Sequence, residues 1–350
     1  MKSGLLLYGA NGYTGRLILD AALGLGVETT IAGRRAEALE PLAKERGLAH
    51  RVFPLDDTAR VAEELAPFKA LLLAAGPFSA TSAPAFQACL LAKTSYLDIT
   101  GEIDVLETLF ARDAEAKAAG ISAVPGVGFD VVPTDGLAAQ LAMALPGASR
   151  LELAFRAGKV SVGTTKTMIE GLPKGGRARV NGELVKVPIG WKTMTVPFPD
   201  TPRTAVTIPW GDVATAWRST GIPNIEVYLA MSPRGIARLR RARFLAPLAG
   251  LAPVQALLKS RASRAVRGPS EEERKTGRSV VWGRVTAPGG RSVEGVLETL
   301  EAYALTAQAS ARAARHVLAG EVKPGVLTPS LAFGPRFVEE VPGTTVRIGA

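Results

Sequence analysis

The stretch GANGYTGR, residues 9–16, decides the fold, because it places three glycines at the end of an apolar run predicted to be a strand over 4–10. A helix is predicted to follow over 14–25. Glycines at such a junction allow a tight turn and let the backbone approach a pyrophosphate, which binds the positive end of the helix. The alternative is a tight turn without a ligand. The candidate nucleotide contacts are Gly9, Asn11, Gly12, Tyr13, Thr14 and Gly15.

The end of the second predicted strand, 27–32, indicates which nucleotide binds. It runs into Gly33, Arg34 and Arg35, where an NAD site places an Asp or Glu against the ribose 2′-hydroxyl. Two guanidiniums suit a 2′-phosphate instead, although one of them could be a solvated residue at the start of a helix. The sequence therefore predicts NADP(H). Asp56, after the third predicted strand, is a candidate contact of the adenine, or alternatively the cap of the helix that follows.

Outward from these motifs, short apolar runs alternate with helical stretches through the first 130 residues. Alternation with short connections predicts a parallel sheet with helices on both faces, the doubly wound α/β (Rossmann) fold, over residues 1–133. The predicted strands are 4–10, 27–32, 51–55, 70–75, 96–99 and 121–124, and the predicted helices are 14–25, 36–46, 58–65, 82–92 and 105–119.

After Pro133 the pattern changes to polar–apolar alternation, which is typical of antiparallel strands with one wet face. Hairpin turns are predicted at Asn181-Gly182 and Gly289-Gly290. We therefore expect a second, α+β domain over 134–299 with a mainly antiparallel sheet, serving substrate binding or dimerisation, and we expect 300–350 to pack back on the first domain. The predicted helices are 135–145 and 303–318, and the predicted strands are 150–157, 183–187, 193–196, 204–208, 225–231, 278–287 and 292–299.

Ligands of open α/β sheets bind at the carboxyl ends of the strands, which directs attention to the polar and glycine-rich loops there. The loop of Ala75, Gly76, Pro77 and Phe78 is expected to pass the nicotinamide ribose. A proton that accompanies hydride transfer needs a donor or water. The candidate donors are Tyr96, Asp98, Glu102 and Asp130. A capping carboxylate is the alternative for Glu102, and a turn residue is the alternative for Asp130.

Composition excludes several classes of protein. Of the 350 residues, 47% are hydrophobic, which argues against long disorder. Cys89 is the only cysteine, so a disulfide scaffold is excluded, and the only histidines, His50 and His316, do not form a ligand-spaced pair, so no metal site is expected. No secretory signal pattern is visible at the start, and we expect a cytoplasmic protein.

The net charge of +10 is concentrated in one segment, which we call the basic stretch, residues 234–267. It holds nine Lys or Arg, no acid, and an apolar part shorter than the roughly 20 residues of a membrane span. It could be a surface helix on an anionic membrane, or it could dock an acyl carrier protein or an acyl-CoA. The alternative is a solvated hairpin or an oligomer contact. Nucleic acid is not expected, since stacking aromatics do not alternate with the arginines.

Seven stretches together resemble the saccharopine dehydrogenase-like oxidoreductases, in particular the branch that includes the trans-acting enoyl reductases. The resemblance runs nearly end to end. It implies an NADP-binding Rossmann domain, a second α+β domain, and Gly9, Gly12, Gly15, Arg34 and the Gly76-Pro77 loop as cofactor contacts. The stretches are GANGYTG (9–15), AAGPF (74–78), CLLAKTSYLDITGE (89–102), PGVGFDVVPTD (125–135), IPWGDVATAWRSTGIPNIEVY (208–228), GPSEEER (268–274) and GVLTPSLAFGPRFVE (325–339).

We therefore expect an NADP(H)-dependent oxidoreductase, as a homo-oligomer such as a homodimer, that reduces a C=C bond of a small lipid-like or thioester-linked substrate. The first alternative is imine reduction on an amino acid, of the saccharopine type. That reaction needs arginines that converge on carboxylates, and the second domain offers Arg156, Arg177, Arg179, Arg203 and Arg218. The second alternative is a dinucleotide-binding protein without turnover.

Overall fold

The computed structural model describes residues 2–156, 158–244 and 246–349. The chain forms two compact units. Residues 1–132 and 303–341 form the first, and residues 133–302 and 342–350 form the second. The sequence predicts that 300–350 packs on the first domain, but the part after residue 341 belongs to the second unit.

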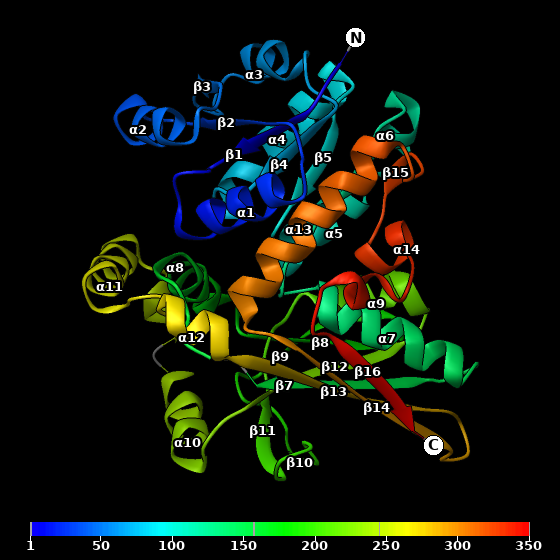
Figure 1. Ribbon diagram of the computed structural model, residues 1–350. Helices are drawn as coiled ribbons and strands as arrows, with labels where there is room; N and C mark the ends of the chain where they lie inside the picture. Colours follow the sequence, from blue (N-terminus) through cyan, green and yellow to red (C-terminus); the bar gives the residue numbers. More distant parts are fainter. Residues whose placement is uncertain (1, 157, 245, 350) are drawn as a thin grey trace. The chain divides into compact units, whose positions relative to one another are not determined.

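The first unit is built on a seven-stranded, wholly parallel sheet (Figure 1). The strand order is β15-β6-β5-β4-β1-β2-β3. Central strands β1 and β4 consist of buried apolar residues only, as expected when helices cover both faces of a parallel sheet. The strands are β1 (Leu5–Tyr8), β2 (Thr29–Gly33), β3 (His50–Val52), β4 (Ala70–Leu73), β5 (Ser95–Asp98), β6 (Ser122–Val124) and β15 (Gly325–Val326).

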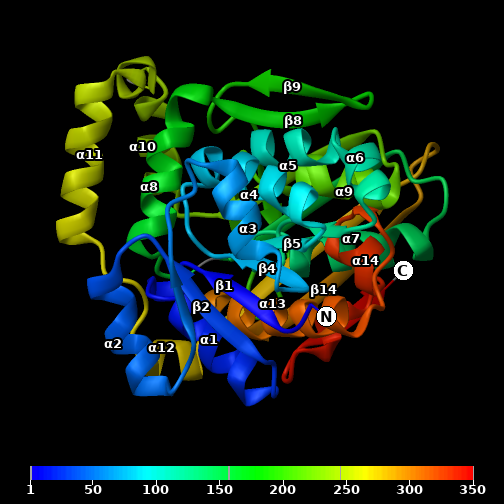
Figure 2. The same cartoon turned by 90° about the horizontal axis from the view of Figure 1, so that it is seen from above.

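Helices cover both faces of this sheet, with α1, α2 and α13 on one face and α3 to α6 on the other (Figures 1 and 2). The helix predicted over 105–119 is in fact two helices, because the backbone leaves the helical conformation at Arg112. The helices of this unit are α1 (Tyr13–Gly24), α2 (Ala36–Arg46), α3 (Thr58–Leu65), α4 (Phe78–Ala92), α5 (Ile103–Phe110), α6 (Asp113–Ala119), α13 (Ala302–Ala319), α14 (Pro329–Phe333) and the 3-10 turn η3 (Phe337–Glu340).

The direction of strand succession reverses between β1 and β4. At such a switch point the connections leave in opposite directions, and the loops after the two strands leave a crevice at the carboxyl edge of the sheet. The glycine stretch follows β1, and the loop to Phe78 follows β4. The predicted doubly wound fold of this part is confirmed, and it brings two of the predicted site loops to neighbouring strands.

The second unit is built on a nine-stranded mixed sheet with the order β10-β11-β12-β7-β13-β14-β16, to which β8 and β9 are added beside β12. Among the described strands of this sheet, only the pairing of β12 with β7 is parallel, so the predicted mainly antiparallel sheet is confirmed. The strands are β7 (Arg150–Arg156), β8 (Gly176–Val180), β9 (Glu183–Val187), β10 (Thr193–Val196), β11 (Arg203–Thr207), β12 (Asn224–Ala230), β13 (Arg278–Thr286), β14 (Ser292–Leu300) and β16 (Thr345–Gly349).

Packing on the two faces of this sheet differs. On one face, helix α7 lies so close that a β-carbon on Gly283 would come within 2.7 Å of Leu141 Cδ1. On the other face, Trp282, Tyr228 and Phe198 are part of a buried apolar cluster. None of the described helices is long and apolar enough to cross a membrane. The helices are α7 (Val132–Ala144), α8 (Val162–Gly171), α9 (Asp212–Thr220), α10 (Pro233–Ala242), α11 (Ala252–Ala265) and α12 (Glu271–Thr276), with the 3-10 turns η1 (Leu172–Lys174) and η2 (Ala246–Gly250).

Candidate functional site

The glycine turn after β1 is closed by backbone contacts that leave no room for side chains. Gly9 has φ of +91°, and a β-carbon there would lie 2.9 Å from Ala75 Cβ. A β-carbon on Gly15 would come within 2.1 Å of the Gly9 carbonyl oxygen. The Gly12 amide donates to the same oxygen at 3.0 Å. Only glycine fits at positions 9 and 15, and the helix therefore begins directly against the end of the strand.

The amino end of α1 carries no neutralising side chain. Gly12 is its N-cap and offers no side-chain acceptor, and the first turn contains no acidic residue. The amides of the first helical turn and the helix dipole therefore favour an anion at this end. Tyr13 lies at the start of the helix with its ring edge-on to Tyr303 of α13, the centroids being 5.1 Å apart. This end of α1 has the features of a pyrophosphate site.

The end of β2 presents two unpaired cations. Arg34 and Arg35 are both exposed, and neither side chain forms a hydrogen bond or ion pair within residues 2–156, 158–244 and 246–349. Gly33 is buried before them, and a β-carbon there would lie 3.4 Å from Asn11 Oδ1 of the glycine turn. The residues predicted to hold the adenosine end of the nucleotide thus come from adjacent loops.

Asp56 is exposed and does not cap the helix that follows. The cap of α3 is Asp57, whose Oδ1 accepts from the amides of Ala59 and Arg60 at 3.1 Å each. Tyr8 connects this loop with the end of β2. Its hydroxyl donates to the Phe53 carbonyl at 2.8 Å, and burial raises its pKa to about 12, an effect that Arg34 opposes and Asp56 reinforces. Asp56 therefore remains a candidate adenine contact.

The loop after β4 is held by Glu102. The loop contains Ala75 and a cis peptide between Gly76 and Pro77, and then α4 begins at Phe78. The Glu102 carboxylate accepts from the Phe78 amide at 2.8 Å and from the Ser79 amide at 3.1 Å. A carboxylate at this position neutralises the positive end of α4. This arrangement favours the capping alternative for Glu102 over the role of proton donor.

Tyr96 and Asp98 form a buried pair at the end of β5. The Tyr96 hydroxyl donates to Asp98 Oδ2 at 2.6 Å, and Asp98 Oδ1 accepts from the amides of Thr100 and Gly126 at 3.0 and 2.8 Å. Burial raises the pKa of Tyr96 well above its usual value and that of Asp98 to about 6. Both side chains are enclosed, and their bonds tie the loop after β5 to the loop after β6. We interpret them as a structural clamp.

Asp130, in the loop after β6, differs from the other three candidates. Its carboxyl is half-buried and makes no hydrogen bond or ion pair with any other described side chain or backbone group. Burial, and next to it the charge of Glu102, raises its pKa to about 7. A β-carbon on Gly101 would lie 2.7 Å from Asp130 Oδ2, so glycine at 101 provides the space for this carboxyl. Asp130 combines a free carboxyl with a pKa close to neutral.

Sequence reasoning missed the residues that hold the loop of Asp130. The Thr306 hydroxyl accepts from the Phe129 amide at 3.0 Å, and the Ser310 hydroxyl donates to the Val127 carbonyl at 3.0 Å. Both hydroxyls come from α13, more than 170 residues along the chain. The polar positions 306 and 310 in an otherwise alanine-rich helix are the one signal in the sequence that could have indicated them.

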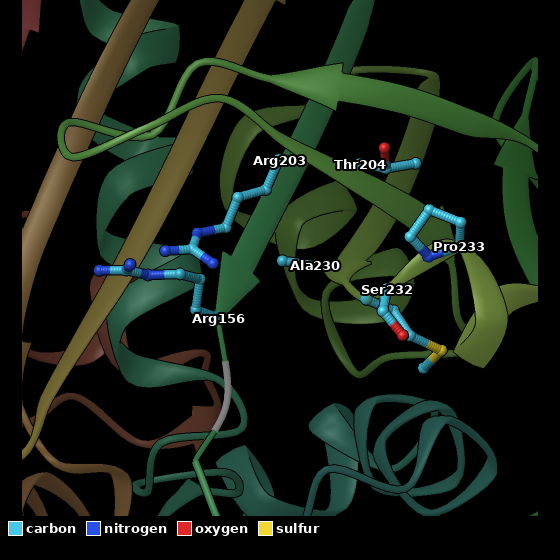
Figure 3. A pocket seen from close by; sticks show the side chains of 7 residues that line it. Arg156, Arg203, Thr204, Ala230, Ser232 and Pro233 are labelled. Atoms are coloured by element: carbon cyan, nitrogen blue, oxygen red, sulfur yellow. The ribbon is translucent and has the colours of Figure 1, made fainter.

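In the second unit, two of the five arginines converge. Arg156 and Arg203 line a hollow of about 380 Å³ together with Thr204, Ser232 and Pro233 (Figure 3). Both contact Asp200 Oδ2, at 2.7 and 2.8 Å. By contrast, the buried Arg179 donates to the carbonyls of Val213 and Gly182, and Arg177 donates to that of Lys174. Arg156 and Arg203 thus line one hollow and share a single carboxylate.

Comparison with known proteins finds similarity both in sequence and in fold. No family model matches the chain. The trans-acting enoyl reductase of Mycobacterium bovis is 29% identical over 144 residues, which cover 37% of this chain and 33% of that protein. The enzyme of the same name from Mycobacterium leprae is 28% identical over 145 residues, with the same coverage. Each match thus spans about a third of the relative's length.

Among solved structures, apo saccharopine dehydrogenase (L-Glu forming) from Saccharomyces cerevisiae has a TM-score of 0.65 and covers 99% of this chain and 100% of its own, at 12% identity. The predicted resemblance is confirmed. The likeness in fold is end to end, whereas the match in sequence to the enoyl reductases covers 37% of the chain.

Proposed function

We propose that this chain is an NADP(H)-dependent oxidoreductase. The observation that carries the proposal is the glycine turn at the switch point together with the two unpaired arginines on the neighbouring strand. A β-carbon on Gly9 would collide with Ala74 and Ala75, and one on Gly15 with the Gly9 carbonyl, so glycine is what lets the turn close tightly enough for a pyrophosphate to approach its backbone. Arg34 and Arg35 have no partner within the described chain. The residues present therefore fit a nicotinamide dinucleotide with a 2′-phosphate.

The glycine turn and the start of α1, with Asn11, Tyr13 and Thr14, would hold the pyrophosphate. Arg34 and Arg35 would hold the 2′-phosphate, and Asp56 would face the adenine. The loop from Ala75 to Phe78 would line the nicotinamide ribose. The bound nucleotide supplies a hydride to the substrate.

The chain's own part in the reaction is to deliver a proton. Reduction of a double bond adds a hydride to one atom and a proton to the other, and Asp130 is the described group best suited to hold that proton. Near neutral pH its raised pKa keeps a large fraction of the carboxyl protonated. Glu102 acts on this group through its negative charge, which disfavours loss of the proton.

The preferred substrate is a small molecule with an activated C=C bond on a lipid-like or thioester-linked chain. The partial similarity to trans-acting enoyl reductases supports this choice. An acyl carrier stays a predicted partner of the chain, and a homodimer stays its predicted assembly.

A second candidate is reduction of the C=N bond of an amino-acid-derived imine. One observation favours it: Arg156 and Arg203 line the same hollow, and paired guanidiniums recognise carboxylates. A carboxylate-bearing substrate would then lose affinity in the Arg156→Gln and Arg203→Gln variants, while an acyl substrate would not.

The first test is a titration with NADPH and with NADH, monitored by fluorescence of the four tryptophans. We expect NADPH to bind more tightly than NADH. NADPH oxidation is then measured with 2-enoyl thioesters and with imines of amino acids. Failure of both nucleotides to bind would contradict the proposal. Tight NADPH binding without turnover of either substrate class would instead favour a dinucleotide-binding protein without catalysis.

A further inference from the structure

The basic stretch, residues 234–267, forms α10, η2 and α11 of the second unit. In Figure 1 these helices lie beyond the ends of the strands of their sheet. Few of their described residues are buried, namely Ile236, Ala246, Ala249 and Ala262. Residue 245 and the side chain of residue 247 lie outside the described part. Most of this segment therefore faces away from the core.

The turn between the two helices exposes large apolar side chains. Phe244 is 72% exposed, Leu248 54% and Leu251 53%, and Leu257 in α11 is 52% exposed. Four exposed apolar side chains within 14 residues form a patch, whereas isolated ones are normal on a protein surface. Covering this patch would remove apolar surface from water and thus favour association.

Arginines flank this apolar turn on both sides. In α10, Arg234, Arg238 and Arg241 follow the spacing i, i+4, i+7 of one helix face, and all are exposed. In α11, Leu257, Arg261 and Arg264 share the same spacing and are also exposed. With Arg243 and Arg267, seven exposed arginines of the stretch form no ion pair within the described chain. The other two cations have partners: Lys259 forms an ion pair with Glu170, and Arg240 donates to the Gly190 carbonyl at 2.9 Å.

We propose that the basic stretch is a docking surface for an anionic lipid bilayer. The apolar side chains of Phe244, Leu248 and Leu251 enter the interface, and the two arginine stripes bind lipid phosphates. A bilayer interface buries the apolar side chains and at the same time places lipid phosphates beside the arginines. The alternative is an acidic protein, which would pair with the arginines, and the experiment below distinguishes it from a bilayer.

Co-sedimentation of the full chain with vesicles tests the proposal. One set is phosphatidylcholine alone, and the other contains about a quarter phosphatidylglycerol. We expect binding to the anionic set, with release at high salt because the charges are then screened. The triple variant Arg238→Gln, Arg241→Gln, Arg243→Gln should bind roughly a hundredfold more weakly. The variant Phe244→Ser, Leu248→Ser, Leu251→Ser should lose a similar factor.

Two controls remove the same charge, or one exposed apolar side chain, elsewhere on the chain. Arg60→Gln, Arg291→Gln, Arg315→Gln has the same net charge as the first variant, and Met143→Ser removes another exposed apolar side chain. Both should bind like the wild type. Circular dichroism verifies that each variant is folded. Equal binding to neutral vesicles, or test variants that bind like the controls, would overturn the proposal. So would capture by an immobilised acidic carrier protein without binding to vesicles.

Discussion

The carbonyl oxygen of Gly9 lies only 2.1 Å from the point where residue 15 would carry a β-carbon. The end of strand β1 and the first turn of helix α1 therefore touch backbone to backbone. The contact fixes where the helix starts, and with it the direction in which the amides of its first turn point. A single methyl group at position 15 would separate the two elements.

Gly15→Ala is therefore expected to lower the free energy of unfolding by about 1–3 kcal/mol and to abolish detectable NADPH binding. The measurements are urea denaturation and the fluorescence titration. Gly24→Ala, at the other end of the same helix, is the control, since nothing lies within 4 Å of a β-carbon there. It should leave binding intact and stabilise slightly. Unchanged NADPH affinity in Gly15→Ala would refute this account of the turn.

Selectivity for NADPH is expected to depend on Arg34 and Arg35. Loss of a charge-assisted hydrogen bond to phosphate costs about 1.5–3 kcal/mol. Arg34→Ala should thus weaken NADPH binding by roughly 10- to 100-fold while NADH binding changes little, and the double variant should lose most of the preference. Arg60→Ala, another exposed arginine of the same unit, is the control. If the double variant still prefers NADPH as the wild type does, the 2′-phosphate lies elsewhere.

Asp130 is expected to give the reaction its pH dependence. Since reduction needs the protonated carboxyl, and burial raises its pKa to about 7, kcat should fall as the pH rises above about 7. Asp130→Asn cannot release a proton and should lose roughly 10²–10⁴-fold in kcat, with the remaining activity free of this pH dependence. A variant that retains the wild-type profile would exclude Asp130 as the donor.

Replacement of Glu102 should shift the pH profile of kcat without abolishing activity. Its negative charge raises the pKa of Asp130, so Glu102→Gln is expected to move the decline in kcat to lower pH. The variant keeps one carbonyl oxygen for the amides at the start of α4, and its NADPH affinity reports on any damage to that loop. A loss of kcat that is uniform across the pH range would show that Glu102 matters only as a cap.

Tyr96→Phe tests the buried clamp. The hydroxyl stabilises ionised Asp98, whose pKa burial has already raised to about 6. A raised pKa in the folded state means stability that is present at low pH and lost as the pH rises through that value. Removing the hydroxyl raises the pKa further, so the variant should lose about 1–3 kcal/mol at pH 8 and less at pH 5. Ser82→Ala, which removes only a neutral partner of Tyr96, should show no such pH dependence.

The sequence predicts those elements of the fold that depend on the residues of the element itself. The leucine runs of β1 and β4 and the glycine turn are readable because burial on both faces and a tight turn each restrict the residue types. The two-residue strand β15 has no such pattern, and it forms only because β6 offers a free edge. The bounds of helices α10 and α11 cannot be predicted from the sequence, because arginine-rich stretches with few buried residues lack a clear apolar face.

For the candidate site, the sequence predicts which loops are involved but not which role each residue has within them. Four candidate donors look alike in sequence, and only the partner of each side chain separates them. Glu102 caps a helix 24 residues upstream, and Asp57 rather than its neighbour Asp56 caps α3. The hydroxyls of Thr306 and Ser310 act on a loop whose position no local pattern encodes. Roles of this kind depend on long-range contacts.

The attachment of the Asp130 loop to α13 has a consequence for biosynthesis. The ribosome releases residues 1–132 first, then the whole second unit, and only afterwards the helix that bonds to Phe129 and Val127. Domains generally fold as units in the order of their synthesis. Here the first unit cannot complete its fold until residues 303–341 have been synthesised, and these follow most of the second unit. The segment that carries the candidate proton donor is therefore among the last to be ordered, and a nascent chain stalled before residue 303 would have the glycine turn without a fixed acid.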